Sequence, residues 1–335
     1  MKIAIAILNW NGLSLLKEYL PEVVKYSNEH PIYIIDNAST DDSVQWIKSH
    51  YENKVEIIIL DQNFGYSGGY NRGIDKIKEE WICLLNSDVR VTENWLEPIT
   101  NAIEKYPKLA ACQPKILDDK QKELFEYAGA AGGFLDRFGY PYCRGRVFDT
   151  IEQDYGQYDT VVDVDWASGA CLFVNKRVFA AAGRLDEDFF AHQEEIDLCW
   201  RIKLLDKEIK AIPSSQVYHK GGATLSYTNP KKTYLNFRNS LFVQVKNNHD
   251  SLWLLHLFIR MVLDGLAAFK LWSDYGFTFF VAVLKAHKDF YLSLGKFVNK
   301  RKAIKKQSVV ENVTLTSFSV VLKYYFWKKT RYQDL

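Results

Sequence analysis

The chain has 335 residues, of which 47% are hydrophobic and 25% are charged, and this composition excludes intrinsic disorder as its main state. At about 100–200 residues per domain, the length accommodates one large domain with an appendage, or two domains. The net charge of +2 is unevenly distributed: residues 241–335 carry 15 Lys and Arg and 6 Asp and Glu, or +9, whereas the first 240 residues carry −7. The C-terminal part is therefore suited to an anionic partner, and the N-terminal part is not.

Strand and helix signals alternate through the first half of the chain. Continuous apolar runs between helical patterns are typical of a mostly parallel sheet covered on both faces, so we predict an α/β fold. The predicted strands are 3–8, 32–36, 55–60, 81–86 and 109–113; the predicted helices are 13–26, one capped by Thr40 or Asp41, a short one after the glycine-rich segment NFGYSGGYNRG, and 93–105.

Polar side chains follow several of these strands. Ligands of such sheets bind beyond the carboxyl ends of the strands. Asn9, Asp36, Asn63 and Asp88 occupy these positions. We therefore expect a site at this edge.

Residues 118–163 are rich in Gly, Tyr and charged residues, and we predict an irregular segment that holds a lid or an acceptor-facing insertion. Regular patterns resume with a strand at 170–174, a helix at 194–205, a strand at 209–212, a loop containing His219 and a helix at 231–246.

The chain changes character near residue 246, so we divide it into a domain of residues 1–245 and a helical, basic region of residues 246–335. Apolar residues recur every three or four positions over 252–269 and 277–294, which predicts two helices, but charges interrupt each run before it reaches the ~18 apolar residues of a spanning helix. Six basic residues follow between Lys296 and Lys306. An aromatic face beside a polybasic cluster favours an anionic membrane surface as a partner. The alternative is a helical bundle packed on the first domain, with a solvated run of charge.

Five scattered cysteines, none in a C-x-x-C pair, indicate reduced, buried thiols and no disulfide framework or zinc site. The N-terminal run MKIAIAILNWNG is too short for the core of a signal peptide and is interpreted as the first strand. Both features favour a cytoplasmic location.

Three single residues are candidates for ligand binding. Asp88, in the segment NSDV, can hold a divalent cation and through it phosphate oxygens, or it can be a turn aspartate that bonds its own backbone. Asp36 can accept hydrogen bonds from a base or a ribose, whereas helix capping explains the polar residues after it. His219, in VYHKGG, is either a further ligand or a structural histidine.

The segment DEDFFAHQEEIDLCWR places Glu194, Glu195 and Asp197 in the first turn of a helix. One of these acids could serve as a general base at the rim of the sheet. Alternatively, they complement the helix dipole, and Asp197 pairs with Arg201.

The segment GYSGG matches the G-x-S-x-G nucleophile elbow of hydrolases. Too few strands precede it, and no oxyanion loop of the expected type lies upstream, so a hydrolase is a minor alternative. The glycines are better interpreted as places where the backbone approaches a ligand. The sequence contains neither G-x-G-x-x-G nor a P-loop motif.

Taken together, eight segments resemble the inverting glycosyltransferases of family 2, especially the bacterial rhamnosyltransferase-like branch, over residues 2–241. They occur in the family's order and spacing: ILNWNG, IIDNASTDDS, NFGYSGGYNRGI, LLNSDV, SGACLFVNK, GRLDEDFFAHQEEIDLCWR, YHKGG and NFRNSL.

The resemblance implies a GT-A fold, in which an α/β domain binds a nucleotide sugar. The acceptor side of that domain comes later in the sequence. It implies that Asp36 and the region of Asn9 hold the base and ribose, and that Asn86 and Asp88 occupy the D-x-D signature. It also implies that Asp88 and His219 hold Mg²⁺ or Mn²⁺. The other donor-side residues that it implies are Asn63, Gly68, Gly69, Asn71 and, less directly, Arg238.

The resemblance further implies that Glu194-Glu195 is the family's acidic pair, with Glu195 taking a proton from the acceptor hydroxyl as that hydroxyl attacks the anomeric carbon. No Q-x-x-R-W follows, so transfer of a single sugar is expected. The implied donor is dTDP-rhamnose first, with UDP- and GDP-sugars open. The implied acceptor is a glycan or a polyprenyl-diphosphate-linked sugar of cell-surface polysaccharide synthesis, at the inner face of the cell membrane.

Two other classes of function stay open. One is a non-catalytic nucleotide-sugar- or carbohydrate-binding protein with a decayed site, and the other is a metal-dependent nucleotidyltransferase. Nucleic-acid binding is not expected, because the basic cluster is short and no recognition module accompanies it. The sequence does not specify an oligomeric state.

Overall fold

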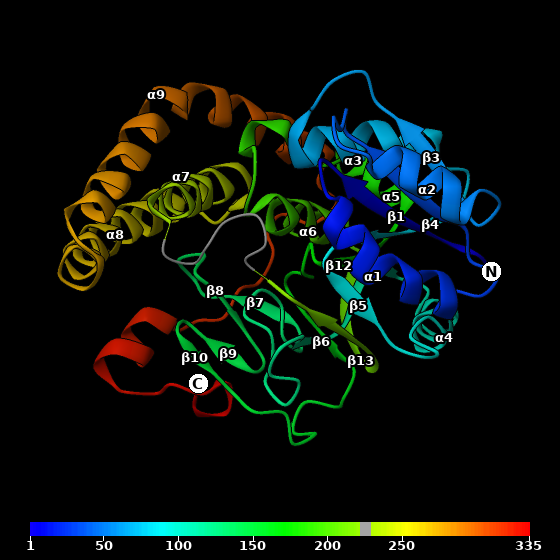
Figure 1. Ribbon diagram of the computed structural model, residues 1–335. Helices are drawn as coiled ribbons and strands as arrows, with labels where there is room; N and C mark the ends of the chain where they lie inside the picture. Colours follow the sequence, from blue (N-terminus) through cyan, green and yellow to red (C-terminus); the bar gives the residue numbers. More distant parts are fainter. Residues whose placement is uncertain (222–228) are drawn as a thin grey trace.

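The computed structural model describes residues 1–221 and 229–335 (Figure 1). Its centre is a nine-stranded sheet, within the described residues, in the order β11-β13-β6-β12-β4-β1-β2-β3, with β5 paired to β13. The strands are β1 (Ile3–Asn9), β2 (Ile32–Asp36), β3 (Val55–Ile59), β4 (Trp81–Leu85), β5 (Val89–Val91), β6 (Leu109–Asp118), β11 (Val162–Asp163), β12 (Cys171–Asn175) and β13 (Glu208–His219). Strands β1 to β4 are parallel, as predicted, but β12 runs antiparallel between β4 and β6, so the sheet is mixed.

Helices cover both faces of the sheet. They are α1 (Leu13–Tyr26), α2 (Ser43–Tyr51), α3 (Gly65–Lys76), α4 (Glu97–Lys105), α5 (Lys176–Ala181) and α6 (Glu194–Leu204). The cap of α2 is Asp42, so the prediction of Thr40 or Asp41 was wrong by one or two residues. The side chain of Asp42 makes no capping hydrogen bond, whereas Asp41 accepts one from the backbone of Ser43, the first residue of α2, and another from the backbone of Leu13.

Helix α3 begins inside the glycine-rich segment and not after it, as had been predicted. A Cβ atom on Gly69 would lie 2.6 Å from Leu8 Cδ1, and one on Gly73 would lie 2.3 Å from Ile35 Cδ1. These two glycines therefore let α3 lie close against β1 and β2.

Residues 118–163 are not irregular throughout, as had been predicted. They contain a four-stranded antiparallel sheet made of β7 (Gly133–Leu135), β8 (Pro141–Cys143), β9 (Arg146–Val147) and β10 (Thr150–Ile151). Strands of two or three residues are too short to show an apolar alternation. This sheet packs against the end of the chain, where Tyr142 and Val147 form an apolar cluster with Val320.

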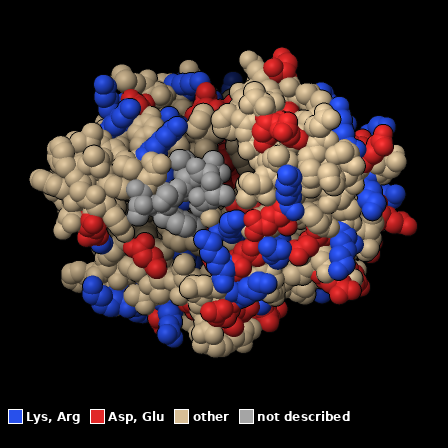
Figure 2. All heavy atoms as spheres, in the orientation of Figure 1, with Lys and Arg blue, Asp and Glu red and all other residues tan. Residues whose placement is uncertain are grey.

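Three long helices form the C-terminal region: α7 (Pro230–Asn247), α8 (Trp253–Tyr275) and α9 (Phe277–Gln307). They lie together at one side of the molecule (Figure 1), where Figure 2 shows a largely uncharged surface over α8. Phe242 of α7 stacks on Phe297 of α9 with ring centroids 3.7 Å apart. None of the helices in the described ranges is long and apolar enough to cross a membrane. The domain boundary near residue 246 falls in the last turn of α7 and stays a prediction.

The core lies on both faces of the sheet. Ile3, Ile5 and Ile7 belong to one apolar cluster and Ala4 and Ala6 to another, because successive side chains of a strand point to opposite faces. All five cysteines are buried, as predicted, and none is paired in a disulfide in this structure.

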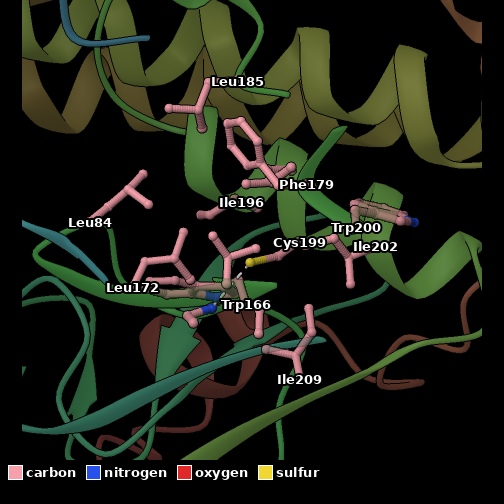
Figure 3. Packing of buried hydrophobic residues seen from close by; sticks show 14 of the residues in the cluster. Leu84, Trp166, Leu172, Phe179, Leu185, Ile196, Cys199, Trp200, Ile202 and Ile209 are labelled. Carbon is pink, nitrogen blue, oxygen red and sulfur yellow. Dashed lines mark hydrogen bonds between the residues drawn. The ribbon is translucent and has the colours of Figure 1, made fainter. Parts of the chain in front are cut away.

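Helix α6 packs on the second of these faces. Figure 3 shows Ile196 and Cys199 of α6 beside Leu172 of β12 and Trp166. The helix that begins with Glu194 and Glu195 is thereby fixed against the sheet.

A buried ion-pair network holds α6 to α7. Asp197 is fully buried; its Oδ2 accepts hydrogen bonds from Arg201 Nη2 at 2.5 Å and Lys246 Nζ at 2.8 Å, and its Oδ1 accepts one from Asn247 Nδ2 at 2.8 Å. The predicted pairing of Asp197 with Arg201 is therefore confirmed. Burial raises the pKa of Asp197, but Arg201 and Lys246 outweigh this effect and lower it, so the carboxylate stays ionised.

The network continues to α9 through Asp186. This carboxylate accepts hydrogen bonds from Lys246 and Lys300, each at 2.6 Å, and Asp188 accepts one from Lys296 at 2.6 Å. Two of the six basic residues in the predicted polybasic cluster, Lys296 and Lys300, are thus held in ion pairs with the segment before α6.

We predict that Asp197→Ala lowers the free energy of unfolding by about 3–5 kcal/mol, because Lys246 and Arg201 would be left buried with less compensating charge. Urea unfolding measures the change. The matched control is Asp206→Ala, which removes the exposed pair with Lys108 and is expected to leave the stability nearly unchanged. Equal midpoints and slopes for Asp197→Ala and wild type would contradict the structural role of the network.

Candidate functional site

The carboxyl ends of β1 and β2 place Asn9 and Asp36 side by side, in register. Both side chains are buried. Asn9 Nδ2 donates hydrogen bonds to Asp36 Oδ1 and Ser39 Oγ at 3.0 Å and to Ser43 Oγ at 2.9 Å, while Asp36 Oδ2 accepts one from the Ser39 amide. Asn9 therefore fixes the orientation of Asp36 at the edge of the sheet.

Asn63 reaches the same edge through Asn37, which the sequence analysis did not single out. Asn63 Oδ1 accepts hydrogen bonds from Asn37 Nδ2 at 2.9 Å and from the Gly65 amide at 2.8 Å. Asn37 Oδ1 in turn accepts one from the Phe64 amide at 3.0 Å. The loop before α3 is thus fastened to the end of β2, and Gly69 lies beside Asn37.

Gly68 and Asn71 face a different neighbour, the segment before η1 (Glu187–Phe189). Asn71 Nδ2 donates to the Leu185 carbonyl at 2.9 Å, and Asn71 Oδ1 accepts from the Leu185 amide at 3.2 Å. Both polar ends of this side chain are therefore engaged within the protein. Asn71 holds two segments of the chain together.

Asp88 and His219 meet where β4 and β13 end and β5 (Val89–Val91) begins. His219 is the last residue of β13 and pairs with Val89 of β5, so it lies in a strand and not in a loop, as had been predicted. Both side chains are buried, and Asp88 Oδ1 lies 3.2 Å from His219 Nε2. Asn86, two residues before Asp88, is partly exposed, and its backbone N–H donates a hydrogen bond to the Ala170 carbonyl at 2.9 Å.

Glu126 completes this group, and the sequence analysis missed it. It is buried, its Oε1 lies 3.2 Å from His219 Nδ1, and its Oε2 accepts a hydrogen bond from the Ala128 amide. Burial lowers the pKa of His219, but Glu126 and Asp88 outweigh this effect and raise it to about 10. One feature of the sequence could have pointed to Glu126. It is the one charged residue in the stretch from Leu124 to Gly133, within a segment that showed no regular pattern.

The Asp88–His219 pair fits a divalent cation. Two ligands that each lie about 2.0–2.2 Å from one ion are about 3 Å apart, which agrees with the distance between Asp88 Oδ1 and His219 Nε2. Carboxylate oxygen and imidazole nitrogen suit Mn²⁺, while Mg²⁺ favours oxygen. Within residues 1–221 and 229–335, no three His, Cys, Asp or Glu side chains are grouped to hold a metal ion. Further ligands would come from a bound substrate or from water.

Glu194 and Glu195 begin α6, and their environments differ. Glu194 is buried, and its Oε2 has no hydrogen-bond partner among the described residues; burial, followed by the charge of Glu195, raises its pKa well above the usual range. Glu195 is partly buried, and burial raises its pKa to about 7. A carboxylate with a pKa near neutrality is suited to general base catalysis, so Glu195 is the better candidate of the two.

The glutamate pair lies near the Asp88 end of β4. A Cβ atom on Gly169 would lie 3.7 Å from Glu195 Cβ and 3.1 Å from Tyr66 Oη, and the next residue, Ala170, accepts the hydrogen bond from Asn86. Tyr66 Oη also donates to the Gly169 carbonyl at 3.0 Å. The short segment before β12 thus connects the two halves of the site.

The loop that leads into the glutamate pair has an unusual backbone and a dedicated support. Three of its residues have positive φ angles without being glycine: Phe190 (67°), His192 (68°) and Gln193 (72°). Asn239 Nδ2, on α7, lies 2.8–2.9 Å from three carbonyl oxygens of residues 189–192. The sequence analysis missed Asn239. Strained loops of this kind persist only where their surroundings hold them in place.

Arg238 supports the same loop. Its Nη2 donates to the Phe189 carbonyl at 3.1 Å, its Nε donates to Asn239 Oδ1 at 2.9 Å, and its Nη1 donates to Tyr234 Oη at 3.2 Å. A contact of Arg238 with a diphosphate stays a prediction. The last glycine of YHKGG, Gly222, lies outside the described residues.

Residues 4–170 match the family model described as "Glycosyl transferase family 2". Among curated proteins, the chain is 24% identical over 263 residues to the N-acetylglucosaminyl-diphospho-decaprenol L-rhamnosyltransferase of Mycobacterium tuberculosis, covering 73% of this chain and 83% of that protein. It is 24% identical over 242 residues to the low-salt glycan biosynthesis hexosyltransferase Agl10 of Haloferax volcanii, covering 71% and 73%.

Solved structures share the architecture at low sequence identity. The structure of S. aureus TarS 1-349 superposes with a TM-score of 0.55 at 12% identity, covering 91% of this chain and 90% of that one. The structure of GalNAc-T7 with UDP, GalNAc and Mn²⁺ gives a TM-score of 0.60 at 15% identity, covering 98% of this chain and 57% of that one. These neighbours share the GT-A fold, and the family match covers strands β1 to β6, at whose edge Asp36 and Asp88 lie. The chain therefore belongs to glycosyltransferase family 2.

Proposed function

We propose that this glycosyltransferase moves a single sugar, with inversion, from a nucleoside diphosphate sugar to a hydroxyl of a glycan or polyprenyl-diphosphate-linked acceptor in cell-surface polysaccharide synthesis. The observation that carries the proposal is the placement of a buried Asp88–His219 pair and a glutamate with a raised pKa at one edge of the sheet. The favoured donor is dTDP-rhamnose, with UDP-hexoses as the second candidate. The name of the mycobacterial relative, an L-rhamnosyltransferase for a diphospho-decaprenol-linked sugar, supports both the donor and the acceptor class.

The donor would bind along the edge formed by β1, β2 and β4. Asp36, held by Asn9, would accept hydrogen bonds from the base or ribose, and Asn63 would line the same pocket. Gly68, Gly69 and Asn71 would shape the pocket through backbone approach and through the contact with Leu185, and Arg238 would contact the diphosphate.

Glu195 would act as the general base. Its carboxylate would accept the proton of the acceptor hydroxyl as this oxygen attacks the anomeric carbon and the nucleoside diphosphate departs from the opposite face. The hydrogen bonds from Asn239 to the preceding loop would hold this carboxylate in place.

Asp88 and His219 would hold Mg²⁺ or Mn²⁺ together with the donor diphosphate. The cation would stabilise the charge that develops on the leaving diphosphate. Glu126 would orient the imidazole so that Nε2 faces the cation, an arrangement common for metal-bound histidines. Because the pKa of His219 is raised, cation binding would release a proton.

We also propose a cytoplasmic protein that is peripheral to the inner face of the cell membrane. A polyprenyl-linked acceptor would be presented there, and the net charge of +9 on residues 241–335 would favour anionic headgroups.

We predict that Glu195→Gln lowers kcat by about 10²–10⁴-fold and leaves donor binding intact, because only proton transfer is lost. In the wild type, kcat should fall as the pH drops below about 7, since protonation removes the base, and Glu195→Gln should lose this dependence. Initial rates from pH 5.5 to 9 and donor titrations measure both effects. Glu97→Gln, in the exposed first turn of α4, is the matched control. A Glu195→Gln enzyme with wild-type kcat would exclude Glu195 as the base.

A nucleoside diphosphate and a divalent cation should bind together. We expect dTDP with Mn²⁺ to raise Tm more than the two separate shifts combined, because one carboxylate and one imidazole hold a cation weakly by themselves. Thermal unfolding with dTDP, UDP or GDP, each with and without Mn²⁺, measures this and identifies the donor nucleotide. Absence of any shift with all three diphosphates would count against the transferase site.

Loss of the Glu126 carboxylate should weaken binding of the cation. Binding of the nucleotide in the absence of a cation should be unchanged. We expect Glu126→Gln to weaken Mn²⁺ binding in the presence of dTDP by about 10–100-fold, the usual effect of losing a partner behind a metal-bound histidine. Titration of Mn²⁺ followed by electron paramagnetic resonance measures this without turnover. Glu123→Gln, at an exposed position nearby, is the control. Equal Mn²⁺ affinities in the two variants would remove Glu126 from the site.

A further inference from the structure

The outer side of α8 is an apolar stripe. Leu255, Phe258, Val262, Leu266 and Phe269 are each 50–65% exposed and follow one another at steps of three or four residues. Over the described ranges, 26 large apolar side chains are exposed, and 14 of them lie between residues 252 and 292. Such a concentration marks an interaction surface, because scattered exposed apolar residues are ordinary whereas contiguous ones are not.

Helix α9 adds a second row beside the first. Phe277, Val281, Leu284 and Tyr291 are 44–56% exposed along this helix. The two rows touch: the rings of Phe269 and Phe280 are 5.1 Å apart, and Tyr291 Oη lies 3.8 Å from Met261 Sδ. We name this surface the α8–α9 face, with these members: Leu255, Phe258, Val262, Leu266, Phe269, Trp272, Phe277, Phe280, Val281, Leu284 and Tyr291.

Exposed lysines border the α8–α9 face, and one of them, Lys270, pairs with the exposed Asp274. Lys270, Lys285 and Lys288 are exposed on its two helices. The three carboxylates of these helices are engaged within the protein: Asp264 with Arg260, Asp274 with Lys270, and Asp289 with Tyr234. No ion pair joins Lys285 or Lys288 to a carboxylate in the part of the chain that the structure describes.

The end of the chain extends this surface. Phe326 is 78% exposed and Trp327 57% exposed, and the exposed Lys328 and Lys329 follow directly. Lys270 Nζ lies 6.0 Å from the centre of the Tyr325 ring, so this turn lies beside α8.

The polybasic cluster continues along α9 from the α8–α9 face. Its first member, Lys296, is five residues beyond Tyr291, which is about 7.5 Å along the helix at 1.5 Å per residue. Part of the cluster is used within the protein, since Lys296 and Lys300 pair with Asp188 and Asp186, and Arg301 donates to the backbone carbonyls of Val245 and Asn248. That the cluster and the apolar residues form one membrane-facing surface stays a prediction.

We propose that the α8–α9 face docks on the surface of an anionic lipid bilayer, with its Leu, Val and Phe side chains in the headgroup–acyl boundary and the surrounding lysines at the phosphates. Trp272 and Tyr291 suit this depth, because their rings are amphipathic. A second copy of the chain is a poorer occupant, since a symmetric pair would bring the lysine-bordered edges of two identical faces together. This inference rests on the proposed function in one respect: docking on the membrane would bring the proposed lipid-linked acceptor near the site.

Flotation of the full chain with vesicles tests the proposal. The vesicles are phosphatidylcholine alone, or phosphatidylcholine mixed with phosphatidylglycerol. We expect binding to the anionic vesicles, and we expect Leu266→Glu and Phe258→Glu each to weaken it by about tenfold or more, because a charge replaces a buried apolar side chain. Tyr155→Glu is the matched control: Tyr155 is 78% exposed in a loop of the other half of the chain and should bind vesicles like the wild type.

Three results would overturn the proposal. One is a wild-type chain that does not float with anionic vesicles. Another is vesicle binding that survives both α8 substitutions. A third is a wild-type dimer in light scattering that Leu266→Glu dissociates, without vesicle binding, which would make the face a contact between copies. Donor binding, measured without vesicles, separates this test from the proposed function. A chain that binds vesicles but no nucleoside diphosphate would support docking by the α8–α9 face and contradict the proposed donor site.

Discussion

The position of α6, the helix that begins with Glu194 and Glu195, depends on one buried carboxylate. Asp197 accepts hydrogen bonds from Arg201 within α6 and from Lys246 on α7, and Lys246 also reaches Asp186, the residue that binds Lys300 of α9. A buried charge of this kind is stable only while its partners stay in place. The first turn of α6, with its glutamates, is therefore coupled to the C-terminal helices and cannot shift independently of them.

The sheet gathers the rest of the site because of two departures from a simple parallel order. β12 runs antiparallel beside β4, so the segment before it, including Gly169, lies at the same edge as Asn86. β13 pairs with β6 along one side and, over Val217–His219, with β5 along the other, and its last residue, His219, thereby meets Asp88. Residues that are far apart in the chain thus form one group.

The site combines rigid and strained parts. Asn9 and Glu126 are buried side chains that orient Asp36 and His219. The loop before α6, in contrast, adopts positive φ angles that cost free energy, and the amide of Asn239 compensates by binding its carbonyls. A precise position for a general base justifies such a cost, because proton transfer is sensitive to small displacements.

The sequence by itself determined the parallel strands, most helix boundaries and the residues at the strand ends, because continuous apolar runs and 3.6-residue periodicity are local properties. The family resemblance added the roles of Asp88, His219 and Glu195, which the measurements above would test. Only the tertiary structure decided the small antiparallel sheet, the contact of Glu126 with His219 and the ion pairs that hold Lys296 and Lys300 to Asp188 and Asp186. These features arise from pairings between distant segments, and a pattern read along the chain contains no information about which distant segments meet.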